Sequence, residues 1–128
     1  MNNIFGIGTD IVDISRVKKL IKSNKKFKNR IFSKKEIKYC ESSINKIASY
    51  SKRFAAKEAF AKALGTGISK GISFNEISIA NRKNGAPFIE LLGRTRTITN
   101  NLIKRKNKIY LSLSDEAKYA VAMVVINY

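Results

Sequence analysis

The sequence predicts one α+β domain, residues 1–128, in which an antiparallel-rich sheet packs on a long central helix. Three observations carry this prediction. With 128 residues and 44% apolar composition, the chain is long enough to bury a core but too short for two well-formed halves. Residues 44–64 are rich in helix-forming residues and contain neither Gly nor Pro. Around it, the order strand, helices, two strands, helix, two strands is typical of an α+β fold.

The N-terminal part begins with a strand. Residues 4–9 are apolar and punctuated by glycine, as in a buried strand, and we expect Asp10 at its end. Asp13 is a suitable N-cap, because apolar residues then recur at helical spacing with Lys and Arg largely between them. This pattern predicts an amphipathic helix with a basic outer face.

Two more helices are expected before the middle of the chain. Ser33 and Glu36 form a capping-box pattern that opens a short helix towards Cys40. Residues 44–64 are rich in Ala, Lys and Glu and hold neither Gly nor Pro, and Gly65 follows as a left-handed terminator. This segment is the predicted long helix.

The C-terminal part alternates between strands and one helix. Residues 76–80 and 87–92 read as the two strands of a β-hairpin. Residues 95–104 are expected to form a third surface helix, although their threonines are poor helix formers. Residues 109–114 and 119–126 are two further strands joined by a polar turn.

The formal charge of +17 points to nucleic acid, an anionic membrane surface, or an acidic protein or phosphorylated ligand. Lys outnumbers Arg 19 to 7, which is also typical of a genome-wide drift in composition, so the total does not choose among these partners. The single cysteine, Cys40, cannot form an internal disulfide, and with no histidine in the sequence it has no partner for a zinc site, so a reducing compartment fits best. With neither a signal-peptide pattern nor a membrane-spanning run, we expect a cytoplasmic protein without a membrane segment.

The candidate chemistry lies in two segments, residues 8–16 and 53–67. On the predicted long helix, Glu58 and Lys62 are four residues apart and share a face, with Arg53 and Lys57 in a neighbouring basic row. We interpret the two segments as one site in which a carboxylate is set among cations.

A hard cation such as Mg²⁺ prefers oxygen ligands and takes only one or two carboxylates, leaving other positions to water and substrate phosphates. Asp10 and Glu58 can supply that pair. Neighbouring lysines would neutralise phosphate oxygens, while Gly65 and Gly67 would let the backbone approach a ligand closely.

Each of these features also has an ordinary structural explanation. A Glu with Lys at i+4 is usually a solvated pair that contributes about a few tenths of a kcal/mol. Asp10 can cap the following helix, and the two glycines can be a helix stop and a turn. The residues by themselves support a metal and phosphate site but no named reaction.

Two motifs add a specific resemblance. Gly8-x-Asp10 followed by five residues and Arg16, together with Phe-x-x-Lys-Glu-Ala-x-x-Lys from Phe54 to Lys62, closely resembles the small holo-acyl-carrier-protein synthases, a group of phosphopantetheinyl transferases. The resemblance covers nearly the whole chain. It implies a phosphopantetheinyl transferase-like fold and transfer of 4′-phosphopantetheine from coenzyme A to a serine of apo acyl carrier protein, releasing adenosine 3′,5′-bisphosphate, in fatty-acid synthesis.

The resemblance also implies roles for particular residues. Asp10 and Glu58 would bind Mg²⁺, which also contacts the coenzyme A pyrophosphate. Lys62 would stabilise charge on the phosphate under attack, and Lys57 and Arg53 would hold the nucleotide side. The carrier serine attacks the β-phosphate, and the group that removes its proton stays open between a metal-bound water and Glu58.

Assembly and docking follow from the same resemblance. The small members are homotrimers with active sites at subunit boundaries, which implies the same here. Ten of the twenty residues from 16 to 35 are Lys or Arg, the densest basic segment of the chain. In the family the matching helix faces the acidic carrier, so we expect Arg16, Lys19 and Lys22 to form the docking surface.

One departure and two alternatives remain. Some members carry a His where this chain has Asp115, which puts any nucleotide contact of that His in doubt. A nucleic-acid-binding protein, suggested by Phe27, Phe32 and Tyr39 among lysines, is the runner-up, but no nucleic-acid-binding motif is present and we expect these aromatics in the core. A non-catalytic scaffold would require a broken metal pair, and both carboxylates are present.

Overall fold

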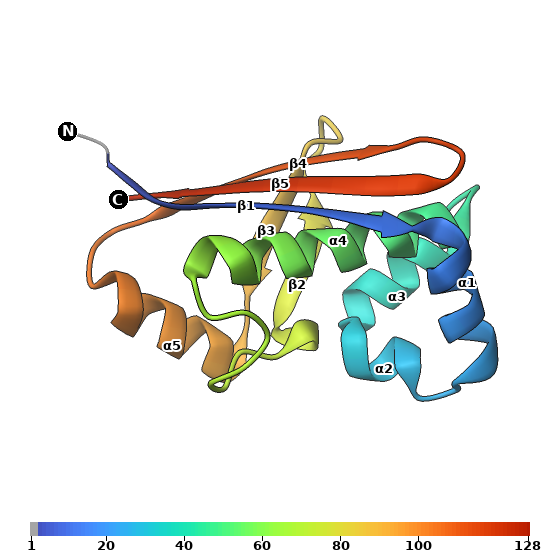
Figure 1. Cartoon of the computed structure of the whole chain (residues 1–128), viewed down its shortest axis with the longest axis horizontal. Helices are drawn as coiled ribbons and strands as arrows, with labels where there is room; N and C mark the ends of the chain where they lie inside the picture. The colour runs from blue at the N-terminus through green and yellow to red at the C-terminus, as the bar shows by residue number, and fades with distance from the viewer. Residues whose placement is uncertain (1–2) are drawn as a thin grey trace.

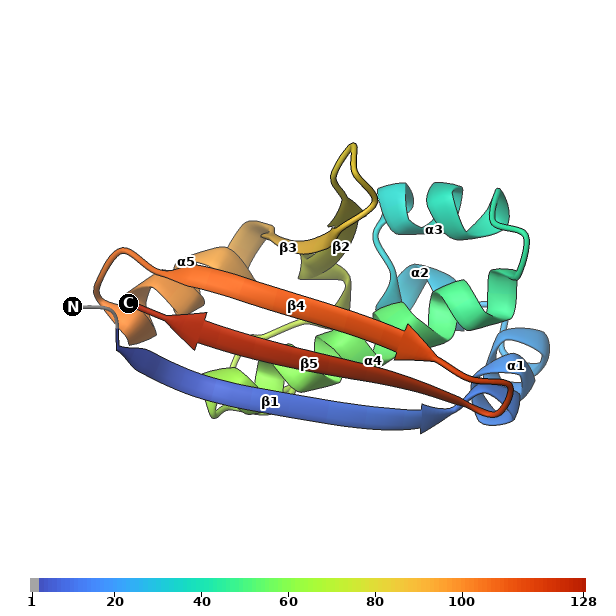
Figure 2. The ribbon, with the colours of Figure 1, turned by 90° about the horizontal axis from the view of Figure 1, so that it is seen from above.

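The computed structural model describes residues 3–128 and confirms the predicted α+β order of elements (Figure 1). Three antiparallel strands form the main sheet in the order β1-β5-β4, and the long helix α4 lies along one face of it (Figures 1 and 2). The bounds of these elements are β1 (Ile4–Asp13), β4 (Lys108–Asp115), β5 (Tyr119–Asn127) and α4 (Lys46–Leu64).

The remaining elements pack around α4. Strands β2 and β3 pair with each other as a separate hairpin rather than joining the main sheet, so the predicted sheet is divided in two. Helices α1 to α3 gather near the end of β1, and α5 lies at the opposite end of the molecule (Figure 1). Their bounds are α1 (Ile14–Ser23), α2 (Phe27–Ile31), α3 (Lys34–Glu41), η1 (Phe74–Glu76), β2 (Ile77–Asn81), β3 (Pro87–Leu91) and α5 (Gly93–Ile103).

Side-chain caps start the helices where the sequence places them. Asp13 Oδ1 accepts a hydrogen bond of 2.8 Å from the Ser15 backbone N–H, and Ser33 forms a reciprocal capping box with Glu36. Helix α4 starts two residues later than predicted, because Asn45 Oδ1 accepts from the Ala48 N–H and caps it there. Helix α2 has no side-chain cap and was not predicted.

Strand β1 packs directly against α4 through glycine. A Cβ on Gly8 would come within 1.8 Å of the Ala59 carbonyl oxygen, and one on Gly6 equally close to that of Ala63. Because side chains alternate along a strand, Asp10 shares this inward face with the two glycines. The absence of side chains at the glycines therefore brings the Asp10 carboxylate up to the surface of α4.

The expectation that Asp10 ends the first strand was wrong. Strand β1 continues to Asp13, and Asp10 lies within it opposite Ala122 of β5. The strand is longer because β5 extends far enough to pair with it as far as Tyr119, which lies opposite Asp13. Asp10 is thus held by a paired backbone instead of a loop.

In the described part of the chain, no helix covers the other face of the main sheet (Figure 1), and this face is largely apolar. Its side chains alternate with the buried ones along each strand, and Ile11 is 63% exposed. The exposed apolar side chains on this outer face are Ile7, Ile11, Tyr110, Tyr119, Val121 and Met123. Within residues 3–128, no helix is long and apolar enough to cross a membrane.

Candidate active site

A cluster of charged side chains lies where β1 crosses α4. Lys62 Nζ lies 3.1 Å from Asp10 Oδ1 and also donates a 2.9 Å hydrogen bond to the carbonyl oxygen of Thr9. Burial raises the pKa of Glu58, the nearby Asp10 carboxylate raises it further, and the cations Lys62 and Arg16 oppose both effects. The structure therefore brings together four charged residues from the two motifs, which are up to 52 positions apart in the sequence: Asp10, Arg16, Glu58 and Lys62.

This donor set fits a hard divalent cation. Within residues 3–128 there is no group of three or more His, Cys, Asp or Glu side chains placed to hold a metal. The Asp10 carboxylate is close enough to act electrostatically on Glu58, and two carboxylates fit Mg²⁺ when water and phosphate oxygens fill its other positions. Burial and then the Asp10 carboxylate raise the pKa of Glu58, and a cation next to both groups would oppose the second effect.

Lys57, predicted to hold the nucleotide, lies elsewhere. Its side chain is fully buried, and Nζ donates to Glu36 Oε1 at 2.6 Å and to the carbonyl oxygens of Phe74 and Ile77. An ammonium has three N–H donors, and these acceptors match that number. The geometry gives Lys57 a structural position, and its predicted nucleotide contact is not supported by where the side chain lies.

The partner of Lys57 connects three elements. Glu36 Oε1 accepts from the Ser33 N–H, and Glu36 Oε2 accepts from the Ile79 N–H of β2. Burial lowers the pKa of Lys57 to about 8, and the Glu36 carboxylate opposes this effect. The buried pair ties α3 and β2 to α4, and so fixes the walls of the pocket described next.

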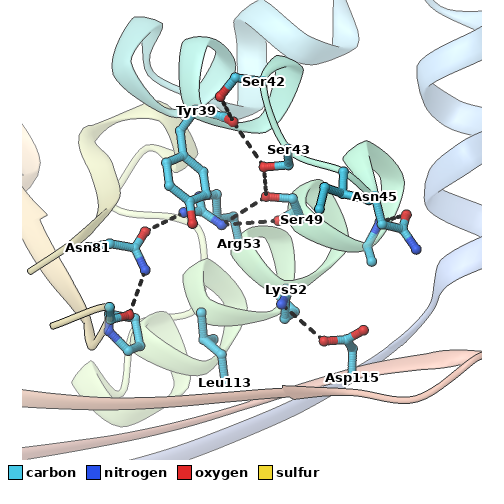
Figure 3. Close-up of a pocket in the computed structure, with 14 residues that line it drawn as sticks. Tyr39, Ser42, Ser43, Asn45, Ser49, Lys52, Arg53, Asn81, Leu113 and Asp115 are labelled. Atoms are coloured by element: carbon cyan, nitrogen blue, oxygen red, sulfur yellow. Dashed lines mark hydrogen bonds and ion pairs between the residues drawn. The ribbon is translucent and has the colours of Figure 1, made fainter. Parts of the chain in front are cut away.

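Arg53 forms the floor of a separate pocket (Figure 3). Its side chain is only 3% exposed. One terminal guanidinium nitrogen donates to Asn81 Oδ1 at 2.7 Å, the other donates to Ser49 Oγ at 3.2 Å, and the guanidinium carbon lies 4.2 Å from the centre of the Tyr39 ring. Neighbours from α3, α4 and β2 thus hold the cation in place.

The pocket has a volume of about 570 Å³, and most of the residues that line it are polar. Arg53 has no carboxylate within 4.0 Å among the described residues, and its Nε is buried there without a hydrogen-bond partner. A buried charge without a counter-ion is costly, so this site favours an anionic ligand. Further lining residues include Tyr39, Ser42, Ser43, Asn45, Ser49, Lys52, Asn81, Pro87 and Asp115.

Most of this lining was not predicted. Tyr39 was expected in the core with Phe27 and Phe32, which are indeed buried, but its ring is 46% exposed and stacks on Arg53. Apart from Arg53, the pocket residues lie outside the two motifs. They come from α3, the segment that joins it to α4, the first turns of α4, the hairpin and the end of β4. Asp115 was noticeable in the sequence, because some family members carry a His at this position.

The two groups of charges face different sides of one chain, which corrects the interpretation of a single cluster. Arg53 and Glu58 are five residues apart on α4, or about 140° around an ideal helix axis. Asp10 lies on β1, whereas Asp115 of the pocket lies on β4, and these strands are opposite edges of the main sheet (Figure 2).

The remaining predicted residues are at the surface. Gly65 and Gly67 follow α4 with φ of +87° and +63°, and a Cβ on either would meet no atom within 4 Å. Within one chain, these glycines are needed for the positive φ of the turn, and neither packs closely against another part of the chain. Arg16, Lys19 and Lys22 are exposed on α1, and only Arg16 acts electrostatically on Glu58.

Comparison with known proteins decides the family. A sequence model described as the 4′-phosphopantetheinyl transferase superfamily matches residues 6–124. The chain belongs to this superfamily. It is 44% identical over 124 residues to the holo-(acyl-carrier-protein) synthase of Blochmanniella pennsylvanica, covering 96% of this chain and 98% of that protein.

Solved structures of superfamily members share the fold. The holo-(acyl-carrier-protein) synthase of Neisseria meningitidis is 36% identical with a TM-score of 0.86, covering 97% of this chain and 98% of the other. The Helicobacter pylori enzyme of the same name, solved in complex with coenzyme A, is 36% identical with a TM-score of 0.79, covering 94% of this chain and 98% of the other. The predicted resemblance and fold class are confirmed.

Proposed function

We propose that this protein is a holo-acyl-carrier-protein synthase, which transfers 4′-phosphopantetheine from coenzyme A to a serine of apo acyl carrier protein. The observation that carries this proposal is the meeting of Asp10, Glu58 and Lys62 at the crossing of β1 and α4. The superfamily match and the near full-length similarity to named synthases support it.

The charged cluster is assigned to the reacting phosphates. Asp10 and Glu58 would hold Mg²⁺, which when bound supplies positive charge next to the pyrophosphate of coenzyme A. The carrier serine oxygen bonds to the β-phosphorus as its hydroxyl proton passes to Glu58 or to water, the bond from that phosphorus to the bridging oxygen breaks, and adenosine 3′,5′-bisphosphate leaves. Lys62 donates to the phosphate oxygens as their charge increases, so its effect falls mainly on the rate.

The Arg53 pocket is assigned to the nucleotide end of coenzyme A. The buried guanidinium has no acidic partner among the described residues and so suits a phosphate. Lys57 would act there indirectly, through the buried pair that fixes α3 and β2. Gly65 and Gly67 would shape the loop that follows Lys62.

The opposed positions of the two sites support an assembly in which they are shared. Within one chain, a coenzyme A whose pyrophosphate lies at Asp10 and Glu58 is on the opposite side of α4 from Arg53. We therefore propose that the nucleotide pocket facing each metal pair belongs to a neighbouring copy in a homotrimer. The apolar outer face of the main sheet suits burial between copies.

The finer assignments follow the same proposal. Arg16, Lys19 and Lys22, exposed on α1 beside the reacting cluster, would dock the acidic carrier protein. The chain would act as one domain over residues 1–128, in the cytoplasm and in fatty-acid synthesis.

The direct test is to incubate the protein with coenzyme A, Mg²⁺ and an apo acyl carrier protein and to weigh the carrier by mass spectrometry. We expect the carrier to gain one 4′-phosphopantetheine group, and expect no gain when Mg²⁺ is chelated. A carrier that keeps its apo mass with every component present rejects the proposed function.

A further inference from the structure

An ion pair lies among the residues that line the Arg53 pocket (Figure 3). Lys52 Nζ of α4 lies 3.0 Å from Asp115 Oδ1 at the end of β4, and the two side chains are 30% and 35% exposed. Because both residues line the pocket, a ligand there meets a cation that already has a partner.

The charges of the pocket are unevenly matched. Arg53 is buried and has no carboxylate within 4.0 Å in the described part of the chain, whereas Lys52 is neutralised by Asp115. Asp115 is the single acidic residue among those that line the pocket. An anion that enters is therefore attracted by both cations and repelled by one carboxylate.

We propose that Asp115 limits how tightly the pocket holds a phosphate, by competing with that phosphate for the Lys52 ammonium. This inference rests on the proposed function. The pyrophosphate of coenzyme A is assigned to the metal pair, so the phosphate left for the pocket is the 3′-phosphate, which the product adenosine 3′,5′-bisphosphate also carries. Lys52 and Asp115 are thus specificity-determining residues for the 3′-phosphate.

The physical basis is competition between two anions for one ammonium. A phosphate monoester carries up to two negative charges and accepts stronger charge-assisted hydrogen bonds than a neutral hydroxyl. A 3′-phosphate can therefore draw Lys52 away from Asp115, while a nucleotide with a free 3′-hydroxyl leaves the ion pair intact. Asp115 therefore weakens the binding only of a ligand that makes this exchange, and so it favours release of the product, which carries the 3′-phosphate.

The test compares two nucleotides that differ only in the 3′-phosphate: adenosine 3′,5′-bisphosphate and adenosine 5′-monophosphate. Titration calorimetry on the full chain measures both dissociation constants without relying on turnover. We expect Asp115→Asn to tighten bisphosphate binding about threefold to tenfold, and Lys52→Met to weaken it by a similar factor. In both variants the dissociation constant of the monophosphate should stay within about twofold of the wild-type value. Lys52→Arg keeps the charge and should retain the preference for the bisphosphate.

A double-variant cycle separates competition from simple repulsion. When Lys52 is replaced by Met, Asp115→Asn should improve bisphosphate binding less than it does in the wild-type chain. Melting temperatures of each variant show whether the fold is intact, and Asp115→Asn is nearly isosteric. The turnover of coenzyme A against dephospho-coenzyme A gives an independent second readout of the same preference.

Two results would overturn the inference. Equal changes for both nucleotides, or no change for either, would show that the pair does not act on the 3′-phosphate. If the wild-type chain binds neither nucleotide, the pocket is not a phosphate site and the inference also fails. Transfer to the carrier protein, measured by mass, tests the proposed function separately in every case.

Discussion

Lys62 Nζ lies 3.1 Å from Asp10 Oδ1, so the cation assigned to the reacting phosphate is held by a carboxylate assigned to the metal. One residue comes from α4 and the other from β1, and the same strand and helix place Glu58 beside them. The positions of Asp10, Glu58 and Lys62 thus depend on how one strand packs on one helix. The fourth charge of the cluster, Arg16, comes from α1.

The metal pair can be tested with nearly isosteric variants. Asp10→Asn and Glu58→Gln should each lower transfer about 100-fold or more, because each removes one of only two carboxylates proposed to bind Mg²⁺. Mg²⁺ should also raise the melting temperature of the wild-type chain and leave that of either variant unchanged. A variant that keeps wild-type turnover at saturating Mg²⁺ contradicts the ligand assignment.

Shared active sites predict complementation between inactive variants. Glu58→Gln and Arg53→Met damage sites on opposite sides of α4, so in trimers assembled at random from equal amounts of the two variants about a quarter of all subunit boundaries recover both wild-type residues. We expect partial recovery of activity that neither variant shows alone.

The matched control pairs Asp10→Asn with Glu58→Gln, which lie on the same edge and should not complement. Light scattering that finds an active monomer, or equal recovery from both pairings, rejects a site shared between subunits.

Gly8 tests the close packing of β1 on α4. Gly8→Ala places a Cβ within 1.8 Å of the Ala59 carbonyl oxygen and should lower the free energy of unfolding by about 3 kcal/mol or more. Gly85→Ala is the control, because it meets no atom and loses only the preference for φ of +89°, about 1 kcal/mol. Equal losses in urea unfolding would show that the contact is not tight.

Glu41 predicts a specific pH dependence of stability. Hydrogen bonds from Tyr50 and Lys28 lower the pKa of Glu41 to about 2, from an ordinary value of 4.5. A lowered folded-state pKa stabilises the protein above pH 4.5, and this contribution is lost as the pH falls from there towards about 2. Glu41→Gln should therefore be less stable than wild type at pH 7 but equally stable near pH 2.

The control for Glu41 is Glu116→Gln in the β4–β5 turn, where the described residues show no ion pair. Melting curves across this pH range measure both differences. A constant difference for Glu41→Gln at every pH would mean that the charge of Glu41 is not what stabilises the fold.

Carrier docking on α1 predicts an effect confined to one substrate. Lys19→Glu or Lys22→Glu should raise KM for the carrier about tenfold at low salt, and less at high salt, with KM for coenzyme A unchanged. Arg16→Glu should have a mixed effect, because the charge of Arg16 also acts on Glu58. Lys106→Glu makes the same charge change at the far end of the molecule and should alter neither constant.

Much of the fold could be predicted from local patterns. The capping residues Asp13 and Ser33 and the terminator Gly65 mark helix ends through contacts within a few residues, so they are visible in the sequence. The end of β1 was misplaced because strand length depends on the partner strand β5. Helix α2 was missed because it is only five residues long and no side chain caps it.

By itself, the sequence determined the order of the main elements and the family, and it singled out the residues of the proposed metal pair, because motifs and helix signals are encoded in neighbouring positions. The tertiary structure decided which charges meet. It turned Lys57 into the core to pair with Glu36, set Arg53 on the opposite side of α4 from Glu58, and joined Lys52 to Asp115. These outcomes depend on how α4 is rotated between the sheet and α3, and that rotation is set by packing across the whole chain.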